Sequence, residues 1–268
     1  LIKESGDLQK GDFAQRNIRF GVREHAMGAI CNGIALHGLG LKPYCATFLV
    51  FTDYMRSAMR VAALSEADVI FVMTHDSIFV GEDGPTHQPI EHVEALRLIP
   101  HLHVFRPADG LETALAWSYA VTQAEGPVVL ALTRQKLPPL PHTDEHAALI
   151  AKGGYVLQEA AQAKVTLLAT GSEVSLALES AKLLAERGIA ARVVSIPCVE
   201  LFMAQEAAYR EQVLGTLPRV SLEAGVTIGW RALVGLDGLC IGIDRFGASA
   251  PASVMAEKFG LTAPQVSK

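Results

Sequence analysis

The sequence contains no long apolar run, no block of like charge and no closely spaced pair of cysteines. No run is long enough to cross a bilayer, so we expect no membrane partner. The 23 Lys and Arg and 28 Asp and Glu are interspersed and give a net charge of −5, which argues against nucleic acid as a partner. The cysteines at 31, 45, 198 and 240 form no CxxC motif, which is typical of reduced thiols in a cytoplasmic protein.

Aliphatic residues are abundant, and half of the 268 residues are hydrophobic. Apolar runs such as Val69–Met73 and Pro127–Thr133 are typical of buried strands, and helix-forming segments such as Thr52–Leu64 and Leu111–Gln123 alternate with them. This alternation predicts parallel βαβ units. We therefore expect an α/β protein of two successive α/β domains with largely parallel sheets.

The stretch from Lys136 to His146 is rich in Pro, His and charge, and it interrupts the alternation. It predicts a boundary between a first domain, 1–145, and a second domain, 146–268. The chain opens with Leu1 rather than Met, in polar sequence, which favours a piece of a longer polypeptide.

A strand, tight turn and helix are predicted near the start of the second domain. The strand covers Val165–Thr170, and Ser172 follows as a natural N-cap for a helix that reaches Arg187. Glu173 then lies in the first turn, where the helix dipole favours a carboxylate.

The most informative segment runs from Thr74 to Pro89, directly after the predicted strand Val69–Met73. Between Thr74 and His87 it holds two histidines and three acidic residues in fourteen positions. Ligands of open α/β sheets bind beyond the carboxyl ends of the strands, so this loop is a candidate site. The alternative is a surface loop whose polar side chains are only solvated.

Three further segments carry chemistry. Glu24 begins an otherwise apolar helix, where a carboxylate either compensates the helix dipole or, shielded by apolar neighbours, holds a proton more readily than in water. Phe48, Phe51 and Tyr54 are three residues apart, which favours either core packing or a stacking surface for a flat heterocycle. Arg134 follows a buried strand, where a guanidinium binds a phosphate or forms a surface salt bridge.

The histidines do not predict a metal centre. His101 and His103 form an HxH pair, and His87 and His92 are five residues apart. Zinc sites need three or four ligands, so we expect no metal site built from this chain alone.

Together these segments resemble the transketolase family over essentially the whole chain. The motifs that carry the resemblance are GVREHAM (21–27), FLVFTDYMR (48–56), THDS (74–77), GEDGPTHQPIE (81–91), RPADG (106–110), LTRQKLP (132–138), ATGSEV (169–174) and FGASAP (246–251). The related synthase that joins pyruvate to glyceraldehyde phosphate has a different loop in place of GEDGPTHQP and ranks well below transketolase.

The resemblance implies a pyrimidine-binding domain of a thiamin diphosphate enzyme followed by a transketolase C-terminal domain. It also implies a transferase of the pentose phosphate pathway that moves a two-carbon ketol unit from a ketose phosphate to an aldose phosphate. The family binds the cofactor's diphosphate through Mg²⁺ or Ca²⁺ with a GDG motif in a preceding domain. No GDG occurs here, so the resemblance implies half of a split site that needs the diphosphate-binding domain in cis or in trans.

The resemblance also implies roles for individual residues. Glu24 would contact the aminopyrimidine ring and promote removal of the thiazolium C2 proton, with Phe48, Phe51 and Tyr54 forming the pyrimidine pocket. The substrate's hydroxyl groups would be bound by His75, Asp83 and His87, with the two histidines moving protons. Arg134 would bind the substrate phosphate.

The family's site lies between two subunits, which implies a homodimer of cytoplasmic enzyme with a large apolar interface. Its second domain serves dimerisation and packing, and no catalytic residue is predicted there. The alternative function is a catalytically silent assembly or binding module of the same fold.

Overall fold

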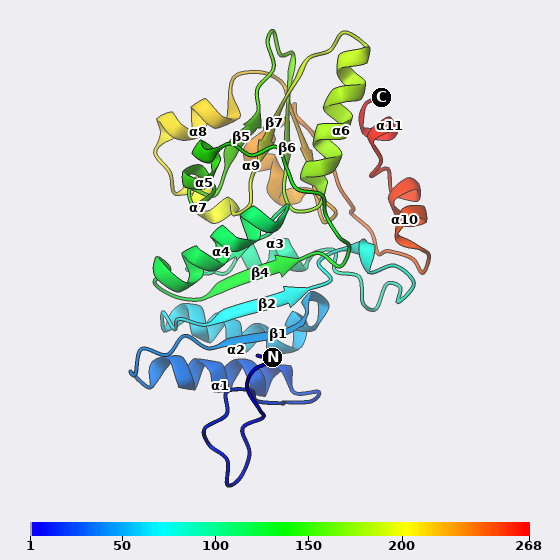
Figure 1. Cartoon of the computed structure of the whole chain (residues 1–268). Coiled ribbons are helices and arrows are strands. Elements are labelled where there is room, and N and C mark those ends of the chain that lie inside the picture. The colour runs from blue at the N-terminus through cyan, green and yellow to red at the C-terminus, as the bar shows by residue number, and fades with distance from the viewer. Residues whose placement is uncertain (1) are drawn as a thin grey trace.

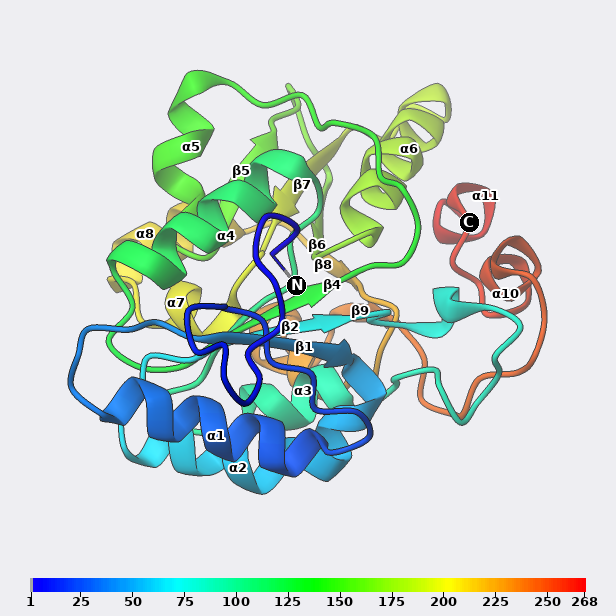
Figure 2. The same ribbon diagram turned by 60° about the horizontal axis from the view of Figure 1, so that its bottom comes forward.

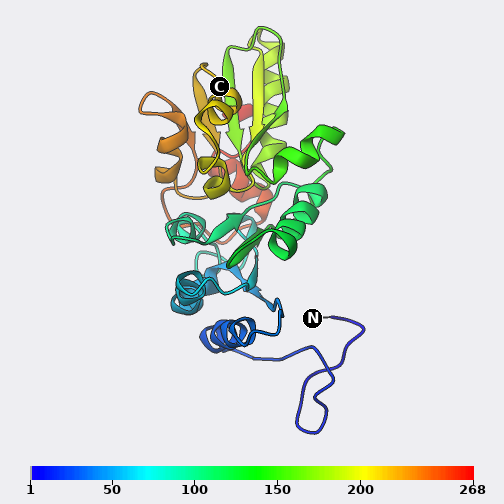
Figure 3. The ribbon, with the colours of Figure 1, turned by 90° about the vertical axis from the view of Figure 1, so that its left-hand side faces the viewer.

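Two α/β domains form the protein, and they lie one above the other in Figure 1. The structure is a computed structural model that describes residues 2–268, so Leu1, on which the expectation of a longer polypeptide rests, lies outside the described residues. The segment before the first helix loops away from the first domain (Figure 3) and holds only two isolated bridges, Asp7–Asn17 and Gln9–Asp12. No helix within 2–268 combines the length and the apolar character needed to cross a membrane.

The first domain contains a four-stranded sheet in the order β1-β2-β4-β3, with every strand pair parallel. Its elements are α1 (Glu24–Leu36), β1 (Tyr44–Phe48), the 3₁₀ turn η1 (Leu49–Phe51), α2 (Thr52–Leu64), β2 (Ile70–Thr74), η2 (Ile78–Val80), α3 (His92–Arg97), β3 (His103–Phe105), α4 (Gly110–Thr122) and β4 (Val128–Leu132). The sequence predicted this alternation of strands and helices.

Helices cover both faces of this sheet, because its strand residues are apolar on both sides. Figure 1 shows α1 and α2 on one face and α4 on the other. Phe71 and Val129 pack toward α1, α2 and α3, whereas their neighbours Ile70 and Val128 pack toward α4. Cys198 of the second domain joins that second cluster, so the two domains share apolar core.

The second domain contains a five-stranded sheet in the order β5-β7-β6-β8-β9, parallel except for β5 against β7. Its elements are α5 (Asp144–Ile150), β5 (Tyr155–Gln158), β6 (Val165–Ala169), α6 (Glu173–Glu186), β7 (Ala191–Ser195), α7 (Val199–Met203), α8 (Ala207–Leu214), β8 (Arg219–Leu222), η3 (Ile228–Trp230), α9 (Arg231–Val234), β9 (Leu239–Ile241), α10 (Ala252–Lys258) and α11 (Ala263–Val266).

Several elements of the second domain were not predicted, among them α5, β5 and the short helices α9, α10 and α11. Helix α5 begins inside the stretch that was expected to be irregular, and β5 is the antiparallel strand at the sheet edge. Thr143 and His146 form a reciprocal capping box at the start of α5, which stabilises a helix too short to show periodicity. Since α5 covers positions 145 and 146, the exact domain boundary stays a prediction.

One local prediction was wrong. Ser172 was expected to cap α6 with its side chain. It occupies the cap position in a helical conformation, and its hydroxyl donates to the Glu173 carboxylate (2.7 Å).

The spacing of the cysteines in the sequence is typical of reduced thiols. All four are free, and Cys31, Cys45 and Cys198 are buried. Gly188, which follows the C-cap residue of α6, has a φ of +76°, the left-handed conformation that glycine adopts without steric cost.

Candidate active site

Three strands of the first sheet end side by side. Phe48, Thr74 and Leu132 are the last residues of β1, β2 and β4, and they are register partners across the sheet. The residues that follow each strand therefore meet at one edge, the carboxyl edge of the sheet, where ligands of α/β proteins bind. His75 follows β2 directly, and Arg134 lies two residues beyond β4.

A continuous aromatic cluster lies at this edge. The Phe48 ring stacks on the His75 imidazole, with centroids 3.9 Å apart, and lies nearly parallel to Phe51 at 6.1 Å. Phe51 also contacts Tyr54 at 6.2 Å and His87 edge-on at 5.6 Å. The sequence predicted that the three aromatics cluster, although they span a strand end, a 3₁₀ turn and a helix rather than one helix face.

Tyr54 presents its ring to solvent, with 68% of the residue exposed. Phe48 and Phe51 are half-buried. Aromatic rings stabilise a fold most when they are fully buried, so a partly exposed row of such rings at the edge of a sheet is unusual. This exposure favours the stacking-surface interpretation over plain core packing.

Glu24 is the first residue of α1 and is half-buried. Helices α1 and α2 pack against each other, since His25 Nδ1 lies 3.1 Å from Ser57 Oγ and the Asn32 amide donates to the Ala58 carbonyl at 2.9 Å. Figure 2 shows that both helices begin on the side to which the β1 arrow points, the carboxyl edge of the sheet. Glu24 therefore lies at the edge that carries the aromatic cluster.

His75 has an uncommon backbone conformation with φ of +62°, in the left-handed region. Its Nδ1 lies 3.1 Å from the Thr74 hydroxyl. Burial lowers its pKa, and the positive charge of Arg134 lowers it further, against opposing effects of Asp83 and Asp76. The neutral form of the imidazole is therefore favoured more than in a free histidine.

The loop that carries Asp83 and His87 is held by the second domain. The buried Gln88 amide donates to the Gly81 carbonyl (2.8 Å) and to the Ala248 carbonyl (2.9 Å). Asp83 is exposed and His87 half-buried, and His87 Nδ1 lies 2.9 Å from the Thr86 hydroxyl. The predicted site residues thus lie at or near one edge of the first sheet.

Sequence reasoning gave no function to Gln88, Asp76 or Arg106, all of which are buried beside this loop. Arg106 Nε donates to Asp76 Oδ2 at 2.8 Å. The sequence held one signal that Arg106 is buried. Arg106 directly follows the apolar strand His103–Phe105 and precedes Pro107, and an arginine at the surface is unexpected in that position.

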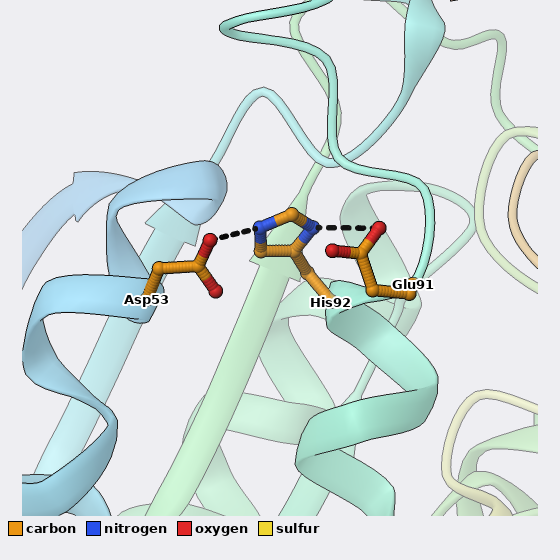
Figure 4. A group of neighbouring side chains, drawn as sticks. All are labelled: Asp53, Glu91 and His92. Atoms are coloured by element: carbon orange, nitrogen blue, oxygen red, sulfur yellow. Dashed lines mark ion pairs between the residues drawn. The ribbon is translucent and has the colours of Figure 1, made fainter. Parts of the chain in front are cut away.

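Asp53, Glu91 and His92 are the one group of side chains within residues 2–268 whose spacing could suit a metal ion (Figure 4). His92 Nε2 lies 3.2 Å from Asp53, whereas Nδ1, on the other side of the ring, lies 3.8 Å from Glu91. One ligand atom from each residue lies within 4.8 Å of the others, but both carboxylates are exposed, and exposed acidic groups often lie together without an ion, so the spacing alone does not establish a metal centre.

Family models account for nearly the whole chain. Residues 2–139 match the model described as "Transketolase, pyrimidine binding domain", and residues 153–262 match "Transketolase-like TK C-terminal domain".

Known proteins are similar along the same length. Chloroplastic transketolase of Solanum tuberosum is 56% identical over 99% of this chain. A crystal structure of Pichia stipitis transketolase complexed with sedoheptulose-7-phosphate superposes with a TM-score of 0.94 at 44% identity, also over 99% of the chain. This chain spans 36% of the potato protein and 39% of the yeast chain.

A shorter relative also matches. The structure called "Split gene transketolase, inactive beta4 tetramer" has a TM-score of 0.76 at 26% identity, and this chain covers 81% of it.

Proposed function

Because the chain belongs to the transketolase family, we propose that it forms the pyrimidine-binding half of a transketolase active site. In that capacity it takes part in transferring a two-carbon ketol unit from a ketose phosphate to an aldose phosphate. The convergence of the aromatic cluster, His75 and the start of α1 at one sheet edge carries the proposal.

The residues fit the pyrimidine ring of thiamin diphosphate. When bound, this cofactor supplies a carbanion stabiliser that the protein's own side chains lack. The rings of Phe48, Phe51 and Tyr54 offer apolar faces to a flat heterocycle, and the half-buried Glu24 carboxylate holds a proton at a ring nitrogen.

The residues around His75 fit a sugar phosphate. The neutral His75 imidazole and His87 exchange protons with hydroxyl groups, and Asp83 accepts hydrogen bonds from them. Arg134 is exposed and presents an unoccupied planar fork to a phosphate. The yeast relative was crystallised with a sugar phosphate, which supports this substrate class.

A second protein part completes the site in this proposal. We assign the diphosphate and its Mg²⁺ or Ca²⁺ to a diphosphate-binding domain, in cis or in trans, because the sequence contains no GDG motif. The outer surfaces of α1 and α2 expose large apolar residues, which supports a homodimer through this face. These residues are Ile30, Leu36, Tyr54, Val61 and Leu64.

The domain division at 145/146 and a cytoplasmic location complete the proposal. The four free thiols fit a reducing compartment. The name of the potato relative places that protein in chloroplasts, which are also reducing, so fractionation of the source cells tests the location.

Calorimetric titration of this chain with thiamin diphosphate and Mg²⁺ tests the half-site. We expect weak or no binding by the chain alone and tight binding once a diphosphate-binding domain is supplied. Tight, magnesium-dependent binding by the isolated chain would contradict the half-site proposal.

Glu24→Ala then separates the enzyme from the silent assembly module. In the completed enzyme we expect this variant to slow hydrogen–deuterium exchange at the cofactor's C2 by about 100-fold or more, a typical effect of removing a proton-transfer group. Glu179→Ala, at an exposed position on α6, is the control. Unaltered exchange in Glu24→Ala would favour the silent module.

A further inference from the structure

A buried ionic cluster joins the candidate site to the second domain. The Arg106 side chain is fully buried, and its Nε donates to Asp76 Oδ2 at 2.8 Å. Its Nη1 donates to the Glu173 carboxylate and to the Thr170 carbonyl, at 3.0 Å from the latter. Asp76 follows His75 in the first domain, whereas Thr170 and Glu173 belong to the second. One guanidinium therefore binds both domains.

Hydrogen bonds of its backbone also hold Arg106 in position. Its N–H donates to the Pro197 carbonyl (2.8 Å), and its carbonyl accepts from the Gly171 N–H (2.9 Å) and the Thr170 hydroxyl (3.0 Å). A Cβ at Gly171 would lie 2.8 Å from Arg106 Cζ, so the turn before α6 closes directly over the guanidinium.

A second buried arginine, Arg97, is linked to the cluster through Glu223. Glu223 accepts two hydrogen bonds from Arg97 (2.8 and 2.9 Å) and lies 3.9 Å from Arg106 Nη1. Burial by itself would lower the pKa of Arg106, but the charges of Asp76, Glu173 and Glu223 raise it above the ordinary arginine value. Arg106 therefore remains a cation at every pH at which the protein is folded.

Asp76 connects Arg106 to His75, because it binds Arg106 and directly follows His75 in the chain. The Asp76 carboxylate is buried and bonded to Arg106, while the preceding residue, His75, is in the left-handed conformation that side chains other than glycine seldom adopt. Such a conformation costs about 1–3 kcal/mol and persists only where its surroundings impose it. On its other side, His75 stacks on Phe48.

We propose that Arg106 is a positioning residue for the candidate site: through Asp76 it holds His75 against Phe48, and it is itself oriented by Glu173 of the second domain. This proposal deepens the proposed function, because it concerns the same site and gives the second domain a part in the reaction. The second domain is then required for the geometry of the imidazole, in addition to packing.

Arg106→Lys tests the proposal in the full chain. Lysine keeps the charge but lacks the planar fork, so it cannot bind Asp76 and Glu173 as arginine does. We expect the His75 ring resonances to shift and its pKa, followed by NMR titration, to move toward the ordinary histidine value. In the completed enzyme we expect kcat to fall by about 10- to 100-fold, the scale of a small misplacement of a reacting group. Thiamin diphosphate affinity should change little.

Two further variants keep the result interpretable. Arg231→Lys, at an exposed position, is the matched control. Glu173→Gln preserves shape and removes the charge that orients Arg106, while its remaining side-chain oxygen still accepts a hydrogen bond, so it replaces Arg106→Lys if that variant does not fold. A folded variant of either kind with His75 resonances and pKa like those of the control would overturn the proposal. The NMR readout needs no turnover, so its result is independent of whether the completed enzyme proves to be a transketolase.

Discussion

At the scale of single residues, His75 shows how neighbouring groups shift the pKa of a side chain. Burial and the nearby Arg134 lower its pKa more than Asp83 and Asp76 raise it. The neutral imidazole is therefore favoured more than in a free histidine, which is the form that the proton exchange proposed for His75 requires.

Arg134→Gln should move the pKa of His75 upward. Loss of the positive charge removes one of the two effects that lower this pKa, so the ring stays protonated to a higher pH than in the unmodified chain. NMR titration of the ring protons measures the change. Arg60→Gln, also exposed but on α2, is the control. Identical His75 titrations in the two variants would show that Arg134 exerts no field at His75.

At the scale of elements, α1 and α2 approach each other closely at the sheet edge that carries the aromatic cluster. Gly28 faces α2, and a Cβ placed there would lie 3.0 Å from both Ala58 and Met55. Gly33, one and a half turns further along α1, has open space around it. The two glycines of one helix therefore differ in whether a side chain fits.

Substituting each of these glycines by alanine should change stability in opposite directions. Gly33→Ala should raise the free energy of unfolding by about 0.5–1 kcal/mol, because alanine favours a helix interior. Gly28→Ala should lower it by about 1–3 kcal/mol, the cost of overpacking. Urea denaturation of the two variants provides the comparison. Equal stabilisation by both would mean that α1 and α2 are not in close contact.

At the scale of the whole molecule, the two domains are joined by apolar and ionic contacts together. Ile78 and Ile90 of the first domain pack with Ile243 and Met255 of the second. The Arg97–Glu223 pair lies beside them, with both side chains nearly inaccessible to solvent. Burial would raise the pKa of Glu223, but Arg97, followed by Arg106 and a hydrogen bond from Trp230, lowers it below its ordinary value.

Glu223→Gln should therefore destabilise the protein by about 3 kcal/mol at neutral pH, since it leaves buried arginine charge without its partner. A lowered carboxyl pKa contributes stability above the unfolded-state pKa and loses it as the pH falls through the folded-state pKa. The difference between the unmodified chain and the variant should thus shrink in acid. Denaturant unfolding at pH 7 and in the acid range checks this, with Glu186→Gln as the exposed control. A difference that does not change with pH would contradict an ionised Glu223.

The sequence by itself determined the alternation of strands and helices, the largely parallel sheets and the segments that supply the candidate site. These features follow from local apolar periodicity and from residues a few positions apart, as in Phe48, Phe51 and Tyr54. It did not determine α5 or β5, because a helix of two turns and a short edge strand carry too little periodic signal.

Only the tertiary structure decided how the site is held in place. Ser172 and Glu173 have the local pattern of a helix start, yet Glu173 binds Arg106, which is 67 positions away in the chain. Gln88 likewise reaches Ala248 over 160 positions. Pairings over such separations depend on which surfaces meet when two domains pack, and a buried charge then takes the partner that packing supplies, because leaving it unpaired costs several kcal/mol.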